Sequence, residues 1–241
     1  MARPRKWLLL SALLTVCACG DRLAGTEVGN PEFTVAARFG IVDTDASASI
    51  PEMNLKVMGL GWTVGKDSAA CWNEPEGHMV DFAADAPAPL PAVTVRKADW
   101  SRAEMLLQAP SEDQAPPGNA TLPDSVPFSD WSDPRYIKLV KITSADTVRA
   151  LFRMPPDLRI RLGFGKAAIG AWRKDADITV TVMFDAGKWA AGLGAQAGFA
   201  FREDGKHARY VLLSPEENVP VYAAMKASLP GCFMADAADM L

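Results

Sequence analysis

Residues 178–184, Ile178-Thr179-Val180-Thr181-Val182-Met183-Phe184, form the most regular pattern in the 241-residue chain. Every second position holds a β-branched or aromatic apolar side chain, and the positions between hold threonine or methionine. Alternation with a period of two is typical of a β-strand that buries one face. The stretch therefore predicts a strand, and the rest of the chain repeats its pattern.

The same alternation predicts further strands on both sides of this one. They fall at 33–41, 55–62, 80–82, 93–95, 105–107, 137–139, 148–152, 158–164 and 211–213. Gly59 or Gly61 is expected to shift the register of the second of these. Hydrophobic residues make up 49% of the chain, enough for a sizeable core. Many short strands between Pro, Gly and Asp clusters indicate a mainly β protein, an antiparallel β-sandwich of one body or two β lobes.

Helical signals are few and short. Residues 186–193 predict a short helix after the clear strand, and a second helix is expected near 215–229, close to the C-terminus. Ser214 reads as its N-cap, and Pro230-Gly231 reads as its end. Tyr222, Met225 and Leu229 would share its buried face.

Residues 109–134 divide the chain by composition. This stretch holds six prolines and no apolar periodicity, which indicates a linker or a long insertion. We therefore expect a first β half at 32–108 and a second β half, including the short helix, at 135–241.

The first nineteen residues predict export. Arg3, Arg5 and Lys6 precede ten residues, Trp7 to Val16, that contain no charge. A helix of that length spans only ~15 Å, about half of a bilayer's hydrocarbon core, so the segment favours a signal peptide over a membrane span. It ends in Val16-Cys17-Ala18-Cys19, which resembles the lipobox of bacterial lipoproteins.

The resemblance implies that residues 1–18 are a signal peptide and that Cys19 carries fatty acyl chains such as palmitate. Residues 19–31 would be a lipidated tether, and 25–31 (GTEVGNP) are similar to the T-E-x-G-N-P segment of uncharacterised Gram-negative surface lipoproteins. Two or three acyl chains anchor a protein durably. Gly20, rather than Asp, follows the cysteine, which favours the outer membrane, with the periplasmic or surface side left open.

Charge and cysteine content narrow the function classes. Without residues 1–18 the chain keeps 22 basic and 29 acidic residues, a net charge of −7, which argues against nucleic acid as a partner. Cys71 and Cys232 remain after Cys17 and Cys19 are assigned. Thiols in an oxidising compartment most often pair, so a Cys71–Cys232 disulfide is expected, with two buried thiols or a metal site as alternatives.

Basic residues are concentrated in one part of the chain. Residues 135–174 hold ten basic and two acidic residues, whereas 72–133 hold eleven acidic and three basic ones. A basic sheet face would bind a polyanion such as anionic lipid or polysaccharide. The alternative is a solvated face balanced by acidic loops, with basic strand edges that prevent aggregation. The candidate polyanion-binding residues are Arg149, Arg153, Arg159 and Arg161.

The sequence contains only weak patterns for a catalytic site or a metal site. Glu74, Glu76 and His78 alternate after Trp72 and are the candidate metal ligands, but a loop rich in Pro and Gly is a poor scaffold for them. His207 lies in what reads as a turn between two strands, at Asp204-Gly205. No nucleophile elbow, zinc-protease motif or P-loop occurs, so no catalytic residue and no cofactor is expected.

Tryptophans near loops offer one more kind of site. Trp72, Trp100 and Trp131 are candidates for a glycan-binding surface, whereas Trp62 and Trp189 are expected to be buried beside strands. Together these features predict a lipid-anchored envelope protein with a non-catalytic binding or structural role. The alternatives are a glycan-binding surface module, a metal-handling lipoprotein and a hydrolase. The expected partners are the membrane, through the anchor, and envelope proteins, anionic lipids or polysaccharide.

Overall fold

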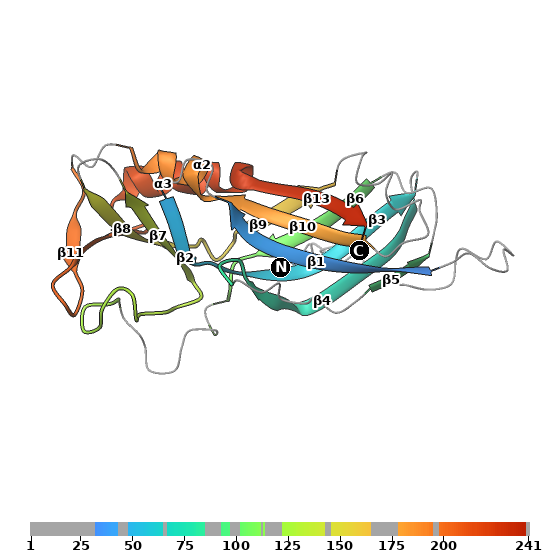
Figure 1. The fold of residues 1–241 in the computed structure, drawn as a ribbon, viewed down its shortest axis with the longest axis horizontal. Coiled ribbons are helices and arrows are strands. Elements are labelled where there is room, and N and C mark those ends of the chain that lie inside the picture. Colours follow the sequence, from blue (N-terminus) through green and yellow to red (C-terminus); the bar gives the residue numbers. More distant parts are fainter. Residues whose placement is uncertain are drawn as a thin grey trace, which may run out of the picture.

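The structure, a computed structural model, describes residues 32–42, 48–64, 67–84, 93–96, 102–111, 113, 122–142, 146–164, 178–194 and 198–239. The described residues form three β-sheets with short helices at one end of an elongated molecule (Figure 1). The expected signal peptide, Cys19 and the tether lie outside these residues.

Sheet A contains the strand at 178–184. Its order is β13-β10-β1-β5, where the strands are β1 (Glu32–Val42), β5 (Val93–Arg96), β10 (Ile178–Asp185) and β13 (Phe233–Asp239). β10 lies inside the sheet, parallel to β1 and antiparallel to β13. Val180, Val182 and Phe184 are fully buried, which confirms the face that the alternation predicts.

Sheet C faces sheet A across the core. Its order is β4-β3-β6-β9, all antiparallel, with β3 (Asn54–Val64), β4 (Asp67–Asp81), β6 (Arg102–Gln108) and β9 (Arg159–Gly163). Phe82, just after β4, contacts the rings of Phe39 in β1 and Phe233 in β13, at 5.1 and 5.8 Å between centroids. The two sheets therefore form a sandwich closed by aromatic packing.

Sheet B lies at the end of the sandwich that carries the helices. Its order is β11-β12-β8-β7-β2, with β2 (Ala48–Glu52), β7 (Tyr136–Ile142), β8 (Thr147–Arg153), β11 (Phe201–Glu203) and β12 (Arg209–Leu213). The chain passes from β2 through the buried Met53 directly into β3, which joins sheet B to sheet C. One face of sheet B is covered by the helical segments α2 (Ala186–Ala190), η2 (Ala191–Leu193), α3 (Val219–Ser228) and η3 (Leu229–Cys232) (Figure 1).

Every sheet mixes strands from both sequence halves. β1 and β5 pair in sheet A with β10 and β13, and sheets B and C are mixed in the same way. The fold class is confirmed as mainly β with a short helix near the C-terminus. Because the halves at 32–108 and 135–241 interleave, they are not separate lobes.

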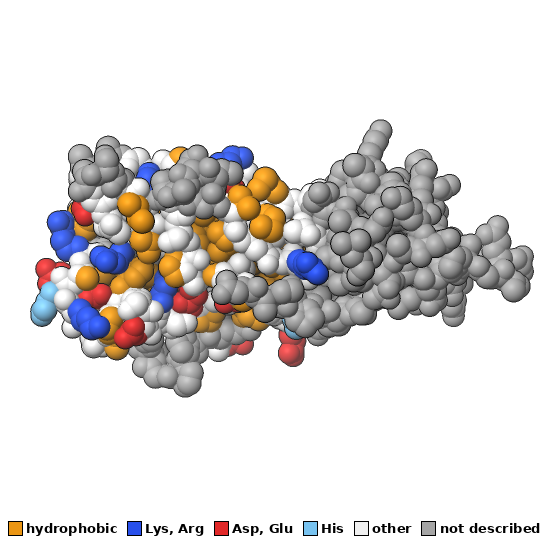
Figure 2. Space-filling model, in the orientation of Figure 1, with side chains coloured by type: hydrophobic (Ala, Val, Ile, Leu, Met, Phe, Trp, Pro, Cys, Tyr) orange, Lys and Arg blue, Asp and Glu red, His pale blue; other side chains and the backbone are white. Residues whose placement is uncertain are grey.

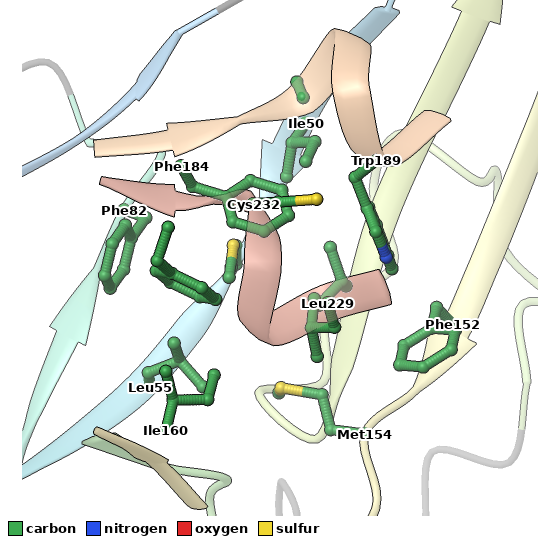
Figure 3. Packing of buried hydrophobic residues seen from close by; sticks show 14 of the residues in the cluster. Ile50, Leu55, Phe82, Phe152, Met154, Ile160, Phe184, Trp189, Leu229 and Cys232 are labelled. Atoms are coloured by element: carbon green, nitrogen blue, oxygen red, sulfur yellow. The ribbon is translucent and has the colours of Figure 1, made fainter. Parts of the chain in front are cut away.

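Residues from the three sheets and the helices pack into one hydrophobic core (Figure 3). Trp189 of α2 is fully buried, and its ring meets Phe152 of β8 and Phe184 of β10 edge to face, at 5.2 and 5.5 Å. Its indole N–H donates to the carbonyl of Met225 in α3 at 3.1 Å. One aromatic side chain therefore links sheets A and B to both helices.

The predicted disulfide is wrong, because Cys232 is a free, buried thiol in this core. Its Sγ–H donates to the Ser228 carbonyl at 3.4 Å, and burial raises the pKa of the thiol. The neighbouring Phe233 contacts Phe82, and Cys71 lies eleven residues before Phe82 along β4. Cys71 pairs with Gly61 of β3, whereas the Phe82 N–H donates to Met53, eight residues earlier. At a rise of ~3.3 Å per residue the two cysteines lie on the order of 25 Å apart, far beyond the reach of a disulfide.

The second helix begins later than predicted. Ser214 Oγ accepts from the backbone N–H groups of Glu216 and Glu217, at 3.2 and 3.0 Å, and this turn occupies the expected first helical residues. Asn218 then adopts a left-handed conformation, with φ of 53°, so α3 starts only at Val219. The predicted buried face is confirmed, since Tyr222, Met225 and Leu229 are all buried.

Candidate functional site: a basic cleft on sheet B

Residues 122–134, called the cover below, lie over the face of sheet B opposite the helices. Phe128 and Trp131 pack there on Leu151, Tyr210 and Leu212 in a second, smaller hydrophobic cluster. Trp131 is only 4% exposed, so the interpretation of its ring as a binding surface is wrong. The side chain of Trp72 and all of Trp100 lie outside the described residues. This stretch is a cover for the sheet and not a linker.

Asp204 fastens this cover to the β11–β12 turn. Its buried carboxylate accepts the N–H groups of Phe128, Lys206 and Ala208, at 2.7, 2.8 and 2.9 Å. Burial alone would raise the pKa of Asp204, but these bonds and the nearby Arg149 guanidinium outweigh it and lower the pKa. The carboxylate is therefore ionised at neutral pH and holds the cover by charge-assisted bonds.

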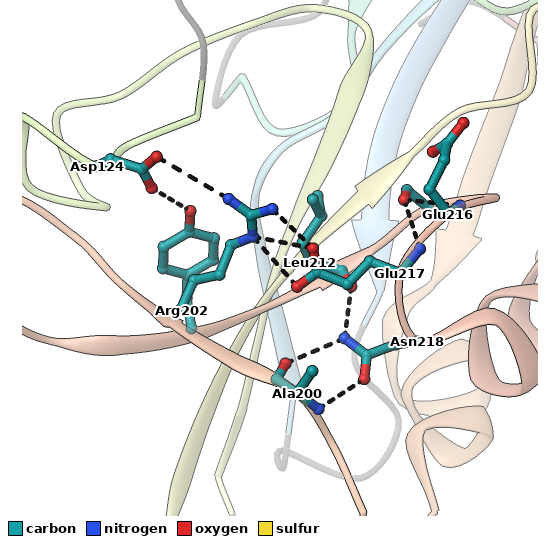
Figure 4. Close-up of polar contacts among 9 residues, drawn as sticks. Asp124, Ala200, Arg202, Leu212, Glu216, Glu217 and Asn218 are labelled. Carbon is teal, nitrogen blue, oxygen red and sulfur yellow. Dashed lines mark hydrogen bonds and ion pairs between the residues drawn. The ribbon is translucent and has the colours of Figure 1, made fainter.

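A second contact fixes the other side of the cover (Figure 4). Arg202 in β11 forms a bidentate pair with Glu217, with Nη2 and Oε2 2.8 Å apart, and reaches Asp124 at 4.0 Å. The Tyr210 hydroxyl donates to Asp124 at 2.9 Å. The pKa of Tyr210 is raised, mainly by burial of the hydroxyl. Asp124 and Asp204 therefore anchor the cover at two separate places.

Between the cover, the turn and sheet B lies an open cleft of about 490 Å³. Lys138, Val140 and Arg149 form its floor, from β7 and β8. The walls come from the end of β2, the cover and the turn: Pro51, Pro127, Phe128, Ser129, Asp204, Lys206 and Ala208. A concave site with apolar walls and a few converging charged groups is typical of small-ligand sites.

Lys138 is the buried charge of the cleft floor. Its ammonium lies 3.2 Å from Glu52 Oε2 and donates to the Ser129 carbonyl at 3.4 Å. It also faces the rings of Phe128 and Trp131, at 5.8 and 5.9 Å from their centroids. A buried ion pair with cation–π support holds the ammonium in one position.

Arg149 stands beside it. Val140 pairs with Arg149 and Lys138 pairs with Leu151, so Lys138 and Arg149 are diagonal neighbours on one sheet face. Such neighbours lie ~7–8 Å apart, with their Cβ atoms somewhat closer. The partly buried Arg149 lies close enough to Asp204 to lower the pKa of its carboxyl, and no described residue accepts a hydrogen bond from the Arg149 guanidinium.

The other predicted arginines do not join this site. Arg153 ends the same strand, whereas Arg159 and Arg161 lie on the exposed face of β9, in sheet C. Other cations of 135–174 are held by the protein itself: Arg135 pairs with Asp133 at 2.6 Å, Lys138 pairs with Glu52, and Lys141 donates to the Ala190 carbonyl. The basic run is thus divided between two sheets and is not one continuous face. On the side drawn in Figure 2, cations are spread over sheet B among apolar side chains.

The metal candidates lie where the alternation fails. The predicted register shift at Gly59 is confirmed: Val57 pairs with His78 but Gly59 pairs with Asn73, which leaves four residues of β4, 74–77, opposite Met58 alone. Gly77 has φ of 73°, so Glu76 and His78 do not follow regular strand geometry. The Glu74 side chain lies outside the described residues, and the described ones contain no cluster of three metal-ligating side chains.

Sequence reasoning missed Asp204 and Lys138 as site residues. The Asp204-Gly205 turn is confirmed, but nothing in its sequence shows that the carboxylate binds residues 76 positions away. One feature of the sequence could have indicated that Lys138 is buried. Tyr136 and Val140, on the same strand face, are large and apolar, as expected for a sheet covered on both faces. His207, on the same turn, is exposed and lies 3.4 Å from Glu203.

No helix among the described residues is long and apolar enough to cross a membrane. Comparison with known proteins finds no matching family model, no matching curated protein and no matching solved structure.

Proposed function

We propose that this chain is a non-catalytic binding protein of the bacterial envelope, anchored in the outer membrane by lipid on Cys19. The observation that carries the binding role is the cleft on sheet B, where Lys138 and Arg149 line the floor of an open hollow. The anchoring rests on the lipobox-like Val16-Cys17-Ala18-Cys19.

The position of the cleft supports a ligand outside the anchoring membrane. The tether would join the fold at Glu32, where β1 begins, and β1 runs from there toward sheet B (Figure 1). Eleven strand residues rise ~36 Å at about 3.3 Å each. The cleft therefore lies at the opposite end of the sandwich from the attachment point, which favours a soluble or glycan ligand over the headgroups around the anchor.

A glycan-binding surface module is the alternative that the cleft also supports, because its walls combine apolar and charged groups. A metal-handling protein and a hydrolase have less support from the described residues. Glu76 and His78 do not converge on a third ligand there, and His207 lies on an exposed turn.

The anchoring is tested by labelling cells with a palmitate analogue and separating membrane from soluble fractions. Cys19→Ser is expected to abolish labelling and to release the protein from the membrane fraction. Cys17→Ser is the matched control, because it removes a thiol two positions away that would leave with the signal peptide. Retention of labelled Cys19→Ser protein in the membrane contradicts the proposal.

A further inference from the structure

We propose that the sheet B cleft binds its ligand through one carboxylate, held between Lys138 and Arg149, with a compact ligand body against the walls. This inference rests on the proposed binding function and names the ligand chemistry of the same site. The carboxylate belongs to a small organic acid, either free or as the acidic sugar unit of a glycan.

The donors of the floor point to an anion. An ammonium has three N–H donors, and Lys138 uses two, on Glu52 and Ser129. Arg149 brings a planar guanidinium that can bind an anion through two N–H groups. It interacts with the charge of Asp204, but no described residue accepts a hydrogen bond from it. Lys138 and Arg149 are diagonal neighbours, about 7–8 Å apart and somewhat closer at Cβ, so one anion between them can contact both the ammonium and the guanidinium.

The charge balance selects a single negative charge. Lys138, Arg149 and Lys206 bring three positive charges, and Asp204 and Glu52 bring two negative ones, which leaves one positive charge. A phosphate monoester carries about −1.5 to −2 at neutral pH and would face two carboxylates nearby. A carboxylate matches the remaining charge and the fork of the guanidinium.

The walls set the size and character of the ligand body. Pro51, Pro127, Phe128 and Ala208 are apolar wall residues, and the exposed Ser129 and Lys206 stand at the rim. A hollow of about 490 Å³ falls within the ~300–1,000 Å³ typical of small-ligand sites. Because Asp204 and Asp124 fasten the cover, the cleft is formed before the ligand arrives, and little ordering cost opposes binding.

Calorimetric titration of the mature, lipidated protein in a non-ionic polyoxyethylene detergent tests the inference. The probes are trigalacturonate, cyclohexanecarboxylate, the neutral methyl ester of each, and methyl phosphate. We expect at least one carboxylate to bind, its ester to bind at least tenfold more weakly, and methyl phosphate to bind more weakly than that carboxylate. Preference for trigalacturonate identifies a glycan source, and preference for cyclohexanecarboxylate identifies a free acid.

The variants locate the binding. Arg149→Gln is expected to weaken the carboxylate at least tenfold, whereas Arg161→Gln, an exposed arginine of β9 outside the cleft, changes it less than twofold. Lys206→Gln is a second test of the site if Arg149→Gln misfolds. The Lys206 side chain lies on the rim of the cleft, and the variant keeps the backbone N–H of residue 206 that donates to Asp204. We expect it to weaken binding severalfold.

Binding of neither carboxylate, or equal loss in Arg149→Gln and Arg161→Gln, overturns the inference. So does Arg149-dependent binding to phosphatidylglycerol vesicles with no binding of either carboxylate. These results leave the Cys19 experiment untouched, so the ligand chemistry and the anchoring proposal fail separately.

Discussion

Replacing Asp204 with alanine is expected to lower the free energy of unfolding by about 3 kcal/mol. The carboxylate accepts three backbone N–H groups, and hydrogen bonds to charged groups contribute about 1.5–3 kcal/mol each. The buried bond from Phe128 N–H accounts for most of the loss, because water cannot replace the acceptor there. The N–H groups of Lys206 and Ala208 lie in a more open turn, where water offsets part of their loss.

Urea unfolding followed by tryptophan fluorescence measures this change, and amide exchange at Phe128 shows whether the cover detaches first. Asp157→Ala is the control, since that carboxylate is exposed and lies 3.9 Å from its Lys226 partner. A loss for Asp204→Ala below about 0.5 kcal/mol, or no faster exchange at Phe128, refutes the role of Asp204 as the clamp of the cover.

The loss of stability in Asp204→Ala is also expected to depend on pH. The folded pKa of Asp204 is lowered, so its stabilisation is fully present above the unfolded carboxyl pKa of about 3.9 and is lost as pH falls through the folded value. The stability difference between wild type and Asp204→Ala should therefore narrow below about pH 4. A difference that stays constant to pH 2 contradicts an ionised, hydrogen-bonded carboxylate.

Other changes probe the cover, the core and the thiol. Gly205→Ala should cost at least ~2 kcal/mol in urea unfolding, because its Cβ would lie 2.5 Å from the Ser125 backbone carbon; a neutral effect contradicts this contact. Trp189→Phe should cost about 2–4 kcal/mol by thermal unfolding, since it removes buried ring area and the bond to Met225; a loss under 1 kcal/mol contradicts its central place. Cys232 should react with a thiol reagent only after denaturation, and rapid labelling of the native protein at this residue would falsify its burial.

Sequence alone identified most strands because each buries one face. Alternation marks β1, β3, β6 to β10 and β12, where one side packs on the core. β13, with the sequence FMADAAD, was missed because small and acidic residues carry no such pattern, and its backbone pairing with β10 defines it. β2 contains Pro51, which fits only an edge strand, the place it occupies.

The first part of β4 shows a different failure. Pro75 and Gly77 suggest a loop, yet β4 continues through the irregularity. It does so because β3 pairs with β4 both before and after residues 74–77. Local turn chemistry was overridden there by pairing with a distant strand.

The cleft depends on register and on distant contacts, which sequence does not determine. Arg149 was a candidate from charge alone, but its place beside Lys138 follows from the pairing of β7 with β8. The clamp by Asp204 requires residues 128 and 204 to meet in space. The disulfide prediction was wrong for a similar reason. An even number of cysteines does not show which of them lie close together in the fold.

The most direct test of the account is the intact mass of the protein extracted from the outer membrane, measured before and after thiol alkylation under denaturing conditions. We expect a chain that begins at Cys19, carries diacylglycerol with or without an N-linked acyl chain, and gains two alkyl groups, on Cys71 and Cys232. A chain that begins at another residue and carries no lipid would contradict the envelope anchoring on which the proposed function depends.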